Sequence, residues 1–149
     1  MKLAEALQER ADLKIRIQNL RQRLLSNALV QEGEKPSEDP AELLKELQET
    51  LSREEKLVAA INLRNCITRV ENRSLTEMIA MRDTLTEKIS IYRDIVSAAS
   101  NIASRASGRE IRILSAYDVR ALQKETDRLA SQLRELNNKI QSTNWTTDL

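Results

Sequence analysis

The stretch "LAEALQERADLKIRIQNLRQRLL" (residues 3–25) decides the fold of this protein. Its apolar side chains recur at alternating steps of three and four residues, which places them along one stripe of an α-helix. Such a stripe needs a neighbouring element to bury it, so the stretch predicts a long helix packed lengthwise against another. The stripe consists of Leu3, Ala6, Arg10, Leu13, Ile17, Leu20 and Leu24.

The same rhythm returns further along the chain, behind clear start signals. "DPAE" (39–42) opens a second helix, because Asp39 can cap it, Pro40 suits its first turn and Glu42 can return the capping bond. "SLTE" (74–77) is another capping box, and "SAYD" (115–118) opens the last helix. The expected buried stripe of the second helix is Leu44, Leu47, Leu51, Val58, Ile61, Asn65 and Thr68.

The composition agrees with a few long helices. Two Gly, two Pro and no Phe leave little room for turns or for the aromatic core of a β-sandwich. Short connections favour antiparallel neighbours, so we expect an all-α chain that forms an elongated antiparallel four-helix bundle. The prediction is a single helical domain, residues 1–149, with helices at about 2–30, 40–70, 74–104 and 116–142.

Charge and cysteine content bear on partners and location. The net charge of +1 argues against a nucleic-acid-binding protein, which would carry a strongly basic face. The single Cys66 cannot form an internal disulfide, which suits a reducing compartment. The first residues lack the apolar core of a signal peptide, and no apolar run reaches the roughly 20 residues that span a bilayer. These features predict a soluble cytoplasmic protein without a membrane role.

A short alternating patch interrupts the helical pattern. "EIRIL" (110–114) reads as a strand and predicts one short strand near residues 109–114. A lone strand is not stable, so it needs a partner. That partner is either "ALVQ" (28–31) or the same segment of another subunit, which makes Ile111 and Ile113 candidate interface residues.

Asparagines occupy the second helical stripe where leucine is expected, in "AINLRNCITR" (60–69). If the first turn lies near residue 35, Arg10 comes level with about residue 60, and similar folding at the other turns brings further polar groups to one height. Two interpretations stay open: a polar layer that fixes helix register, or a pocket that holds a phosphate or carboxylate. The residues of this layer are Arg10, Asn62 or Asn65, Arg82, and Asn137 or Asn138.

The sequence lacks the usual chemistry of an enzyme. It has no His, and a single Cys cannot build a zinc site. Gly33 and Gly108 stand alone, so there is no glycine-rich phosphate loop. "ELQE" (46–49) offers two carboxylates but has no matching acidic pair downstream for a magnesium site. We therefore predict no catalytic residues, no metal site and no cofactor.

Several segments together resemble a bacterial family sometimes labelled septicolysin. They include "MKLAEALQERADL" (1–13), "INLRNCITR" (61–69) and the closing "NWTTDL" (144–149), and the similarity runs essentially from end to end. The resemblance implies a small all-helical protein that forms a homo-oligomer, with a hexamer as the suggested size. The family label itself suggests a pore-forming cytolysin.

These observations predict a non-enzymatic, self-associating helical bundle. Its stripes carry more apolar residues than one bundle interior needs, and a surplus of this kind is typical of a subunit interface. Leu63 and Trp145 join the two isoleucines as candidate interface residues. The alternatives are a protein that binds a small anion and a cytolysin-like protein. The surplus residues are Leu7, Leu25, Leu43, Leu57, Leu63 and Ile79.

Overall fold

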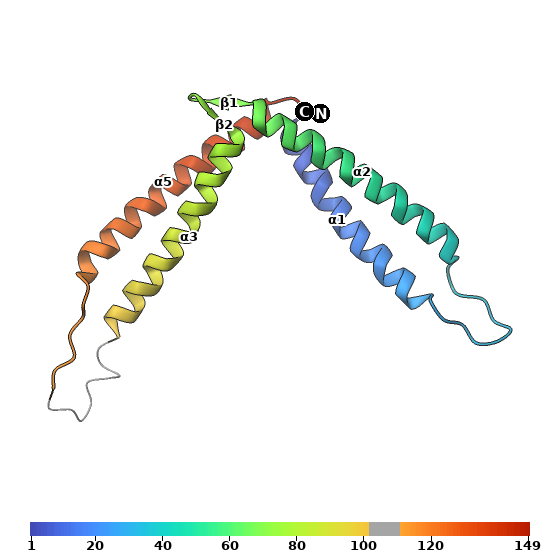
Figure 1. Cartoon of the computed structure of the whole chain (residues 1–149), viewed down its shortest axis with the longest axis horizontal. Helices are drawn as coiled ribbons and strands as arrows, with labels where there is room; N and C mark the ends of the chain where they lie inside the picture. Colours follow the sequence, from blue (N-terminus) through green and yellow to red (C-terminus); the bar gives the residue numbers. More distant parts are fainter. Residues whose placement is uncertain (102–110) are drawn as a thin grey trace. The chain divides into compact units, whose positions relative to one another are not determined.

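A computed structural model describes residues 1–101 and 111–149 of the chain. These residues contain four long helices, α1 (Leu3–Ser26), α2 (Pro40–Ile67), α3 (Leu75–Ser100) and α5 (Val119–Thr146) (Figure 1). The all-α class and the four long helices are therefore confirmed. Contacts divide the chain into two compact units, Met1–Val70 with Thr143–Leu149, and Glu71–Ser142, where we expected a single domain. A heptad stripe is satisfied by one partner helix, so the pattern alone does not distinguish one core from two.

In the first unit, α1 and α2 form an antiparallel helical hairpin (Figure 1). The core of the hairpin is aliphatic and narrow, as expected from a chain without Phe. The buried side chains of α1 lie on its predicted stripe. The buried side chains of the hairpin are Leu3, Ala6, Leu13 and Leu20 on α1, and Leu43, Thr50, Leu57 and Ile61 on α2.

The buried side of α2 differs from the prediction by one residue. Leu44 and Leu51, expected to be buried, are 57 % and 44 % exposed. Leu43 and Leu57, expected beside the seam, are 3 % exposed and face the core. The reason is that α2 carries two neighbouring apolar stripes, and the heptad spacing fits both.

The first and last residues of the chain contact each other in the first unit. The backbone N–H of Leu3 donates to the carbonyl of Thr147 at 2.9 Å, and that of Leu149 donates to Met1 at 3.0 Å. The Nζ of Lys2 lies 2.8 Å from a carboxylate oxygen of Asp148. The last turn of α5 therefore belongs to this unit, and α5 ends four residues beyond the predicted boundary at residue 142.

In the second unit, α3 and the main part of α5 lie side by side (Figure 1). The predicted capping box at the start of α3 is confirmed. The Oγ of Ser74 accepts the N–H of Glu77 at 3.1 Å, and the Glu77 carboxylate accepts the N–H of Ser74 at 2.6 Å. The buried apolar side chains of this unit are Leu75, Met78 and Ile89 on α3, and Leu129 and Ile140 on α5.

Two short strands, β1 (Arg69–Val70) and β2 (Arg73–Ser74), form a two-stranded sheet. Glu71 and Asn72 between them have positive φ angles of 50° and 68°, as a tight two-residue hairpin turn requires. The strand predicted near residues 109–114 is absent from residues 111–114, and residues 109 and 110 lie outside the described ranges. Alternation over so few residues is a weak signal when no neighbouring strand supplies hydrogen bonds.

Candidate functional site

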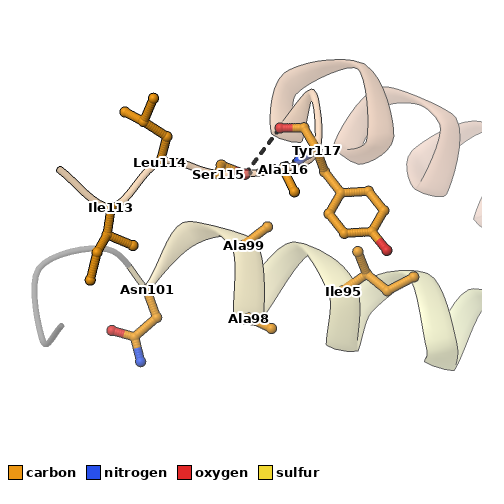
Figure 2. A pocket seen from close by; sticks show the side chains of 9 residues that line it. All are labelled: Ile95, Ala98, Ala99, Asn101, Ile113, Leu114, Ser115, Ala116 and Tyr117. Atoms are coloured by element: carbon orange, nitrogen blue, oxygen red, sulfur yellow. Dashed lines mark hydrogen bonds between the residues drawn. The ribbon is translucent and has the colours of Figure 1, made fainter. Parts of the chain in front are cut away.

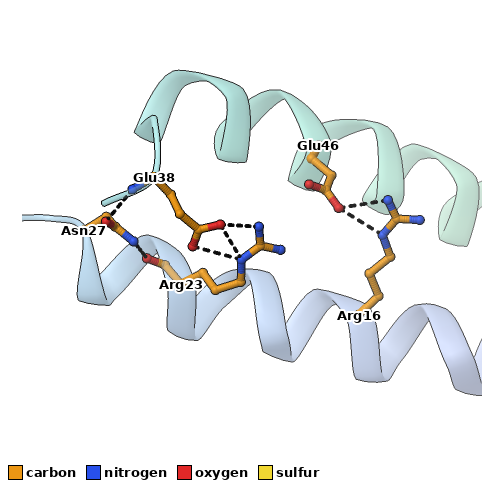
Figure 3. A network of polar contacts seen from close by, with 5 residues as sticks. All are labelled: Arg16, Arg23, Asn27, Glu38 and Glu46. Carbon is orange, nitrogen blue, oxygen red and sulfur yellow. Dashed lines mark hydrogen bonds and ion pairs between the residues drawn. The ribbon is translucent and has the colours of Figure 1, made fainter. Parts of the chain in front are cut away.

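Ion pairs follow one side of the hairpin formed by α1 and α2. Arg16 donates to Glu46 through Nη2 at 2.8 Å, and Arg23 donates to Glu38 through Nε at 3.1 Å (Figure 3). Nearer the termini, Arg53 of α2 holds Glu9 of α1. We call this side the ion-pair flank, defined by these three pairs.

The joint between α1 and α2 continues the ion-pair flank. The Asn27 side chain donates to the carbonyl of Arg23 at 2.8 Å and accepts the N–H of Glu38 at 3.1 Å (Figure 3). The hydrogen bonds from Arg23 lower the pKa of Glu38 below its ordinary value, because they favour the carboxylate. This closing of the joint explains why α1 ends at Ser26 and not near residue 30.

On the opposite side of α1, a line of apolar residues runs beside the buried stripe. Arg16 and Ile17 follow the buried Leu13 by three and four residues, so they lie on opposite sides of the buried stripe. Arg16 belongs to the ion-pair flank, and Ile17 therefore lies on the other flank. Leu24, seven residues beyond Ile17, falls on the same line, and both side chains are half-buried.

The same geometry applies to α2. Glu46 and Leu47 follow the buried Leu43 by three and four residues, and Glu46 lies on the ion-pair flank. Leu47 therefore lies on the other flank, where Leu44 and Leu51 extend the apolar surface and help to line a shallow hollow. We call this surface the apolar flank, which consists of Ile17, Leu24, Leu44, Leu47 and Leu51.

The apolar flank is a surface without a cover within the first unit. Leu44 and Leu51 are large side chains that expose about half of their area. Scattered exposed leucines are ordinary, but a contiguous apolar stripe along a hairpin is typical of a surface that packs against another protein. The arrangement can bind an apolar helical face.

Two charged residues interrupt the apolar flank. Arg10 lies seven residues before Ile17, and Glu54 lies seven residues after Leu47, so each continues the line of its helix. Both are half-buried, and within the described residues the Nε of Arg10 is fully buried without a hydrogen-bond partner. Leaving such a donor unpaired costs about 1–3 kcal/mol, and more for a charged group.

The ion pairs also establish the register of the hairpin. Arg16 meets Glu46, and Glu9 meets Arg53, so seven residues along α1 correspond to seven residues back along α2. Arg10 is therefore level with Ser52. The predicted level near residue 60 is wrong, because the joint closes earlier than the turn that we assumed near residue 35.

This register separates Arg10 from the asparagines of α2. Asn62 lies ten residues beyond Ser52, which is about 15 Å along the helix. Asn62 is exposed and Asn65 is half-buried. The first unit therefore does not bring Arg10 together with Asn62 or Asn65, and the expectation that they share one level is wrong.

The other two predicted layer residues lie in the second unit. Arg82 on α3 is half-buried, and its guanidinium contacts the carboxylate of the neighbouring Asp83 at 2.7 Å. Asn137 on α5 is half-buried, and Asn138 beside it is exposed. A guanidinium that already holds a carboxylate has fewer donors left for an anion.

The predicted interface residues are mostly exposed, as an interface requires. Leu63 is 69 % exposed, Trp145 is 60 % exposed and Ile111 is 82 % exposed, whereas Ile113 is half-buried. Trp145 lies in the last turn of α5 and not in a tail after the helix. The reasoning from sequence missed the apolar flank as a surface, because it assigned all five of its residues to the buried stripes of the two helices.

A second apolar hollow lies in the second unit, where the end of α3 meets the segment before α5 (Figure 2). It encloses about 340 Å³ and is lined mainly by aliphatic side chains, with Tyr117 at one side. Ser115 donates to the carbonyl of Tyr117 at 3.0 Å and shapes this segment. The aliphatic lining residues are Ile95, Ala98, Ala99, Ile113, Leu114 and Ala116.

The described residues contain no cluster of three or more His, Cys, Asp or Glu side chains that could hold a metal ion. None of their helices combines the length and the apolar character needed to cross a membrane.

The fold and this surface define an all-α protein built from helical hairpins with an exposed apolar flank. The chain belongs to a family of unknown function, DUF6847, whose model matches residues 10–149. It is also similar to a functionally unknown conserved protein from Corynebacterium diphtheriae, with 38 % sequence identity over 100 % of this chain and 98 % of that one. The TM-score of this crystal structure is 0.93. No curated protein matches the chain.

Proposed function

We propose that this protein is a non-enzymatic helical protein that acts by associating with copies of itself. The apolar flank is the observation that carries the proposal, because Leu44 and Leu51 remain exposed after the hairpin has buried its own core. An uncovered aliphatic stripe is unfavourable in water, and covering it is the usual driving force of association. The two charged residues within the apolar flank, Arg10 and Glu54, provide recognition and not catalysis.

Light scattering coupled to size exclusion tests this proposal. We expect a mass that is an integral multiple of the chain mass of 17.0 kDa at micromolar concentration. Dilution should shift the mass toward one chain, since hydrophobic association follows mass action. A mass of one chain at all concentrations up to the millimolar range would contradict self-association.

The location that we propose is the cytoplasm. Cys66 is the single cysteine of the sequence and lies on the exposed surface of α2. An exposed thiol is best preserved where glutathione keeps the compartment reducing. Fractionation of cells with an antibody against the protein tests this location, and recovery outside the cytoplasmic fraction would contradict it.

The second candidate function is binding of a small anion, and it rests on Arg10. The buried Nε of Arg10 has no acceptor among the described residues, and a phosphate or carboxylate would supply one. Thermal unfolding with millimolar phosphate tests this candidate, with Arg10→Gln as its control. Binding raises the midpoint of the native protein but not that of the variant, whereas equal midpoints with and without phosphate rule the anion out.

A further inference from the structure

We infer that the apolar flank is covered by the same flank of a second copy of the chain, and that Arg10 of each copy pairs with Glu54 of the partner subunit. This inference rests on the proposed self-association and adds the surface, the symmetry and a recognition pair. Two hairpins would then make a four-helix bundle. The inference begins with the unpaired charges inside the flank.

Arg10 and Glu54 lie at nearly the same height on the hairpin. Arg10 is level with Ser52, and Glu54 lies two residues further along α2, which is about 3 Å of helix rise. Their charges are opposite, and among the described residues Glu54 takes part in no ion pair. The Nε of the half-buried Arg10 has no acceptor among the described residues, and a carboxylate of a second copy at this height would pair with its guanidinium.

Symmetry selects the arrangement that supplies the carboxylate. A two-fold axis parallel to the helices places α1 of one copy over α2 of the other at equal height. Arg10 then faces Glu54 of the partner subunit, and the symmetry forms the pair twice. A two-fold axis across the helices would instead place α1 over α1 and α2 over α2, so that Arg10 would not face Glu54 of the partner subunit.

The apolar residues of the flank also pack together under the same two-fold axis. Ile17 is level with Lys45, between Leu44 and Leu47, so each isoleucine would enter the space between two leucines of the partner subunit. Packing of this kind, with a side chain between residues three apart on a facing helix, is the normal contact of helical bundles. The aliphatic contacts would provide affinity, and the charged pair would set the register.

Reversing one charge at a time tests the inference. Arg10→Glu leaves two acidic residues at each recognition site, and Glu54→Arg leaves two basic residues. Each variant alone should associate roughly a hundredfold more weakly than the native protein, because like charges meet inside a desolvated contact. An equimolar mixture should regain the native mass, since the acidic sites of one variant match the basic sites of the other.

The experiment with the mixture distinguishes an Arg10–Glu54 pair between two copies from one within a single chain. A pair formed inside one hairpin could not be repaired by mixing, so mixtures that stay as weak as the single variants would overturn the inference. Arg16→Glu is the matched control, because it breaks an ion pair on the opposite flank and should leave the mass unchanged. Circular dichroism of each variant checks that the helices remain folded.

A further variant keeps the test decisive if either charge reversal prevents folding. Leu44→Lys changes a side chain that is 57 % exposed in the single chain, so the hairpin core should tolerate it. It should weaken association as strongly as the charge reversals. A native protein of one chain mass would refute the proposed function itself, whereas a native oligomer that tolerates Leu44→Lys, or both charge reversals, would refute only the assigned surface.

Discussion

The guanidinium of Arg53 holds the carboxylate of Glu9 through two hydrogen bonds, from Nε at 2.6 Å and from Nη2 at 2.8 Å. The two residues lie 44 positions apart in the sequence and belong to different helices. In this bidentate contact α1 supplies the acid and α2 the base, whereas in the Arg16–Glu46 pair α1 supplies the base and α2 the acid. Both pairs can therefore form together in only one alignment of the hairpin. The ion-pair flank therefore specifies how α1 and α2 match.

The Glu9–Arg53 contact predicts how stability depends on pH. Its hydrogen bonds lower the pKa of Glu9, so the carboxylate stabilises the folded state above its unfolded pKa of about 4.3. That contribution is lost as the pH falls through the lower, folded-state pKa. We expect the unfolding midpoint to drop between about pH 5 and pH 3, and more gently in Arg53→Gln. Calorimetry across this range measures the difference, and parallel curves would contradict it.

The two apolar stripes of α2 predict different effects for two similar substitutions. Leu57→Ala removes a side chain that is 3 % exposed and should cost about 2–5 kcal/mol of unfolding free energy. Leu51→Ala on the apolar flank, where the side chain is 44 % exposed, should cost much less in the single chain. Urea unfolding at low protein concentration compares them. Equal losses would mean that the assignment of the stripes is wrong.

The capping box of α3 predicts a local loss of stability. Ser74→Ala removes the acceptor of the Glu77 N–H and should cost about 0.5–2 kcal/mol. Ser52→Ala is the control, because Ser52 is exposed inside α2 and alanine is the better helix former there. Chemical unfolding of both variants gives the comparison. A stability of Ser74→Ala equal to that of the native chain would show that the cap contributes nothing.

The paired termini predict that a short truncation is costly. Removing residues 147–149 deletes the hydrogen bonds from Leu3 to Thr147 and from Leu149 to Met1, each worth about 0.5–1.5 kcal/mol. Asp148→Asn keeps both backbone bonds and loses only an exposed ion pair, so it should stay near native stability. Hydrogen exchange at Leu3 reports the effect directly. Unchanged protection after truncation would contradict the role of the termini.

Much of the fold could be predicted because its signals are local. Asp39, Pro40 and Ser74 act within one helical turn, and each marks a helix start where it was expected. The end of α5 was less predictable. Trp145 lies in a polar stretch, but the N–H of Leu3 donates to the carbonyl of Thr147, two residues beyond Trp145, and this contact extends the ordered structure beyond the local pattern.

The candidate site was predictable only in part. Arg10 stood out as a charge inside an apolar stripe, and the structure leaves its Nε buried and unpaired within the described residues. Asn62 stood out for the same reason, yet it is exposed and about 15 Å from the level of Arg10 along α2. The difference arises at the joint, because a shift of the turn by a few residues moves every facing pair.

The sequence by itself determined that the chain would form four long helices with aliphatic faces, since periodicity and capping depend on neighbours within a few residues. Only the tertiary structure decided which leucines of α2 became core and which became surface. Leu43 and Leu44 are chemically identical, and packing against α1 turned the first inward and left the second exposed. That choice depends on contacts between residues far apart in the chain, which no local pattern contains.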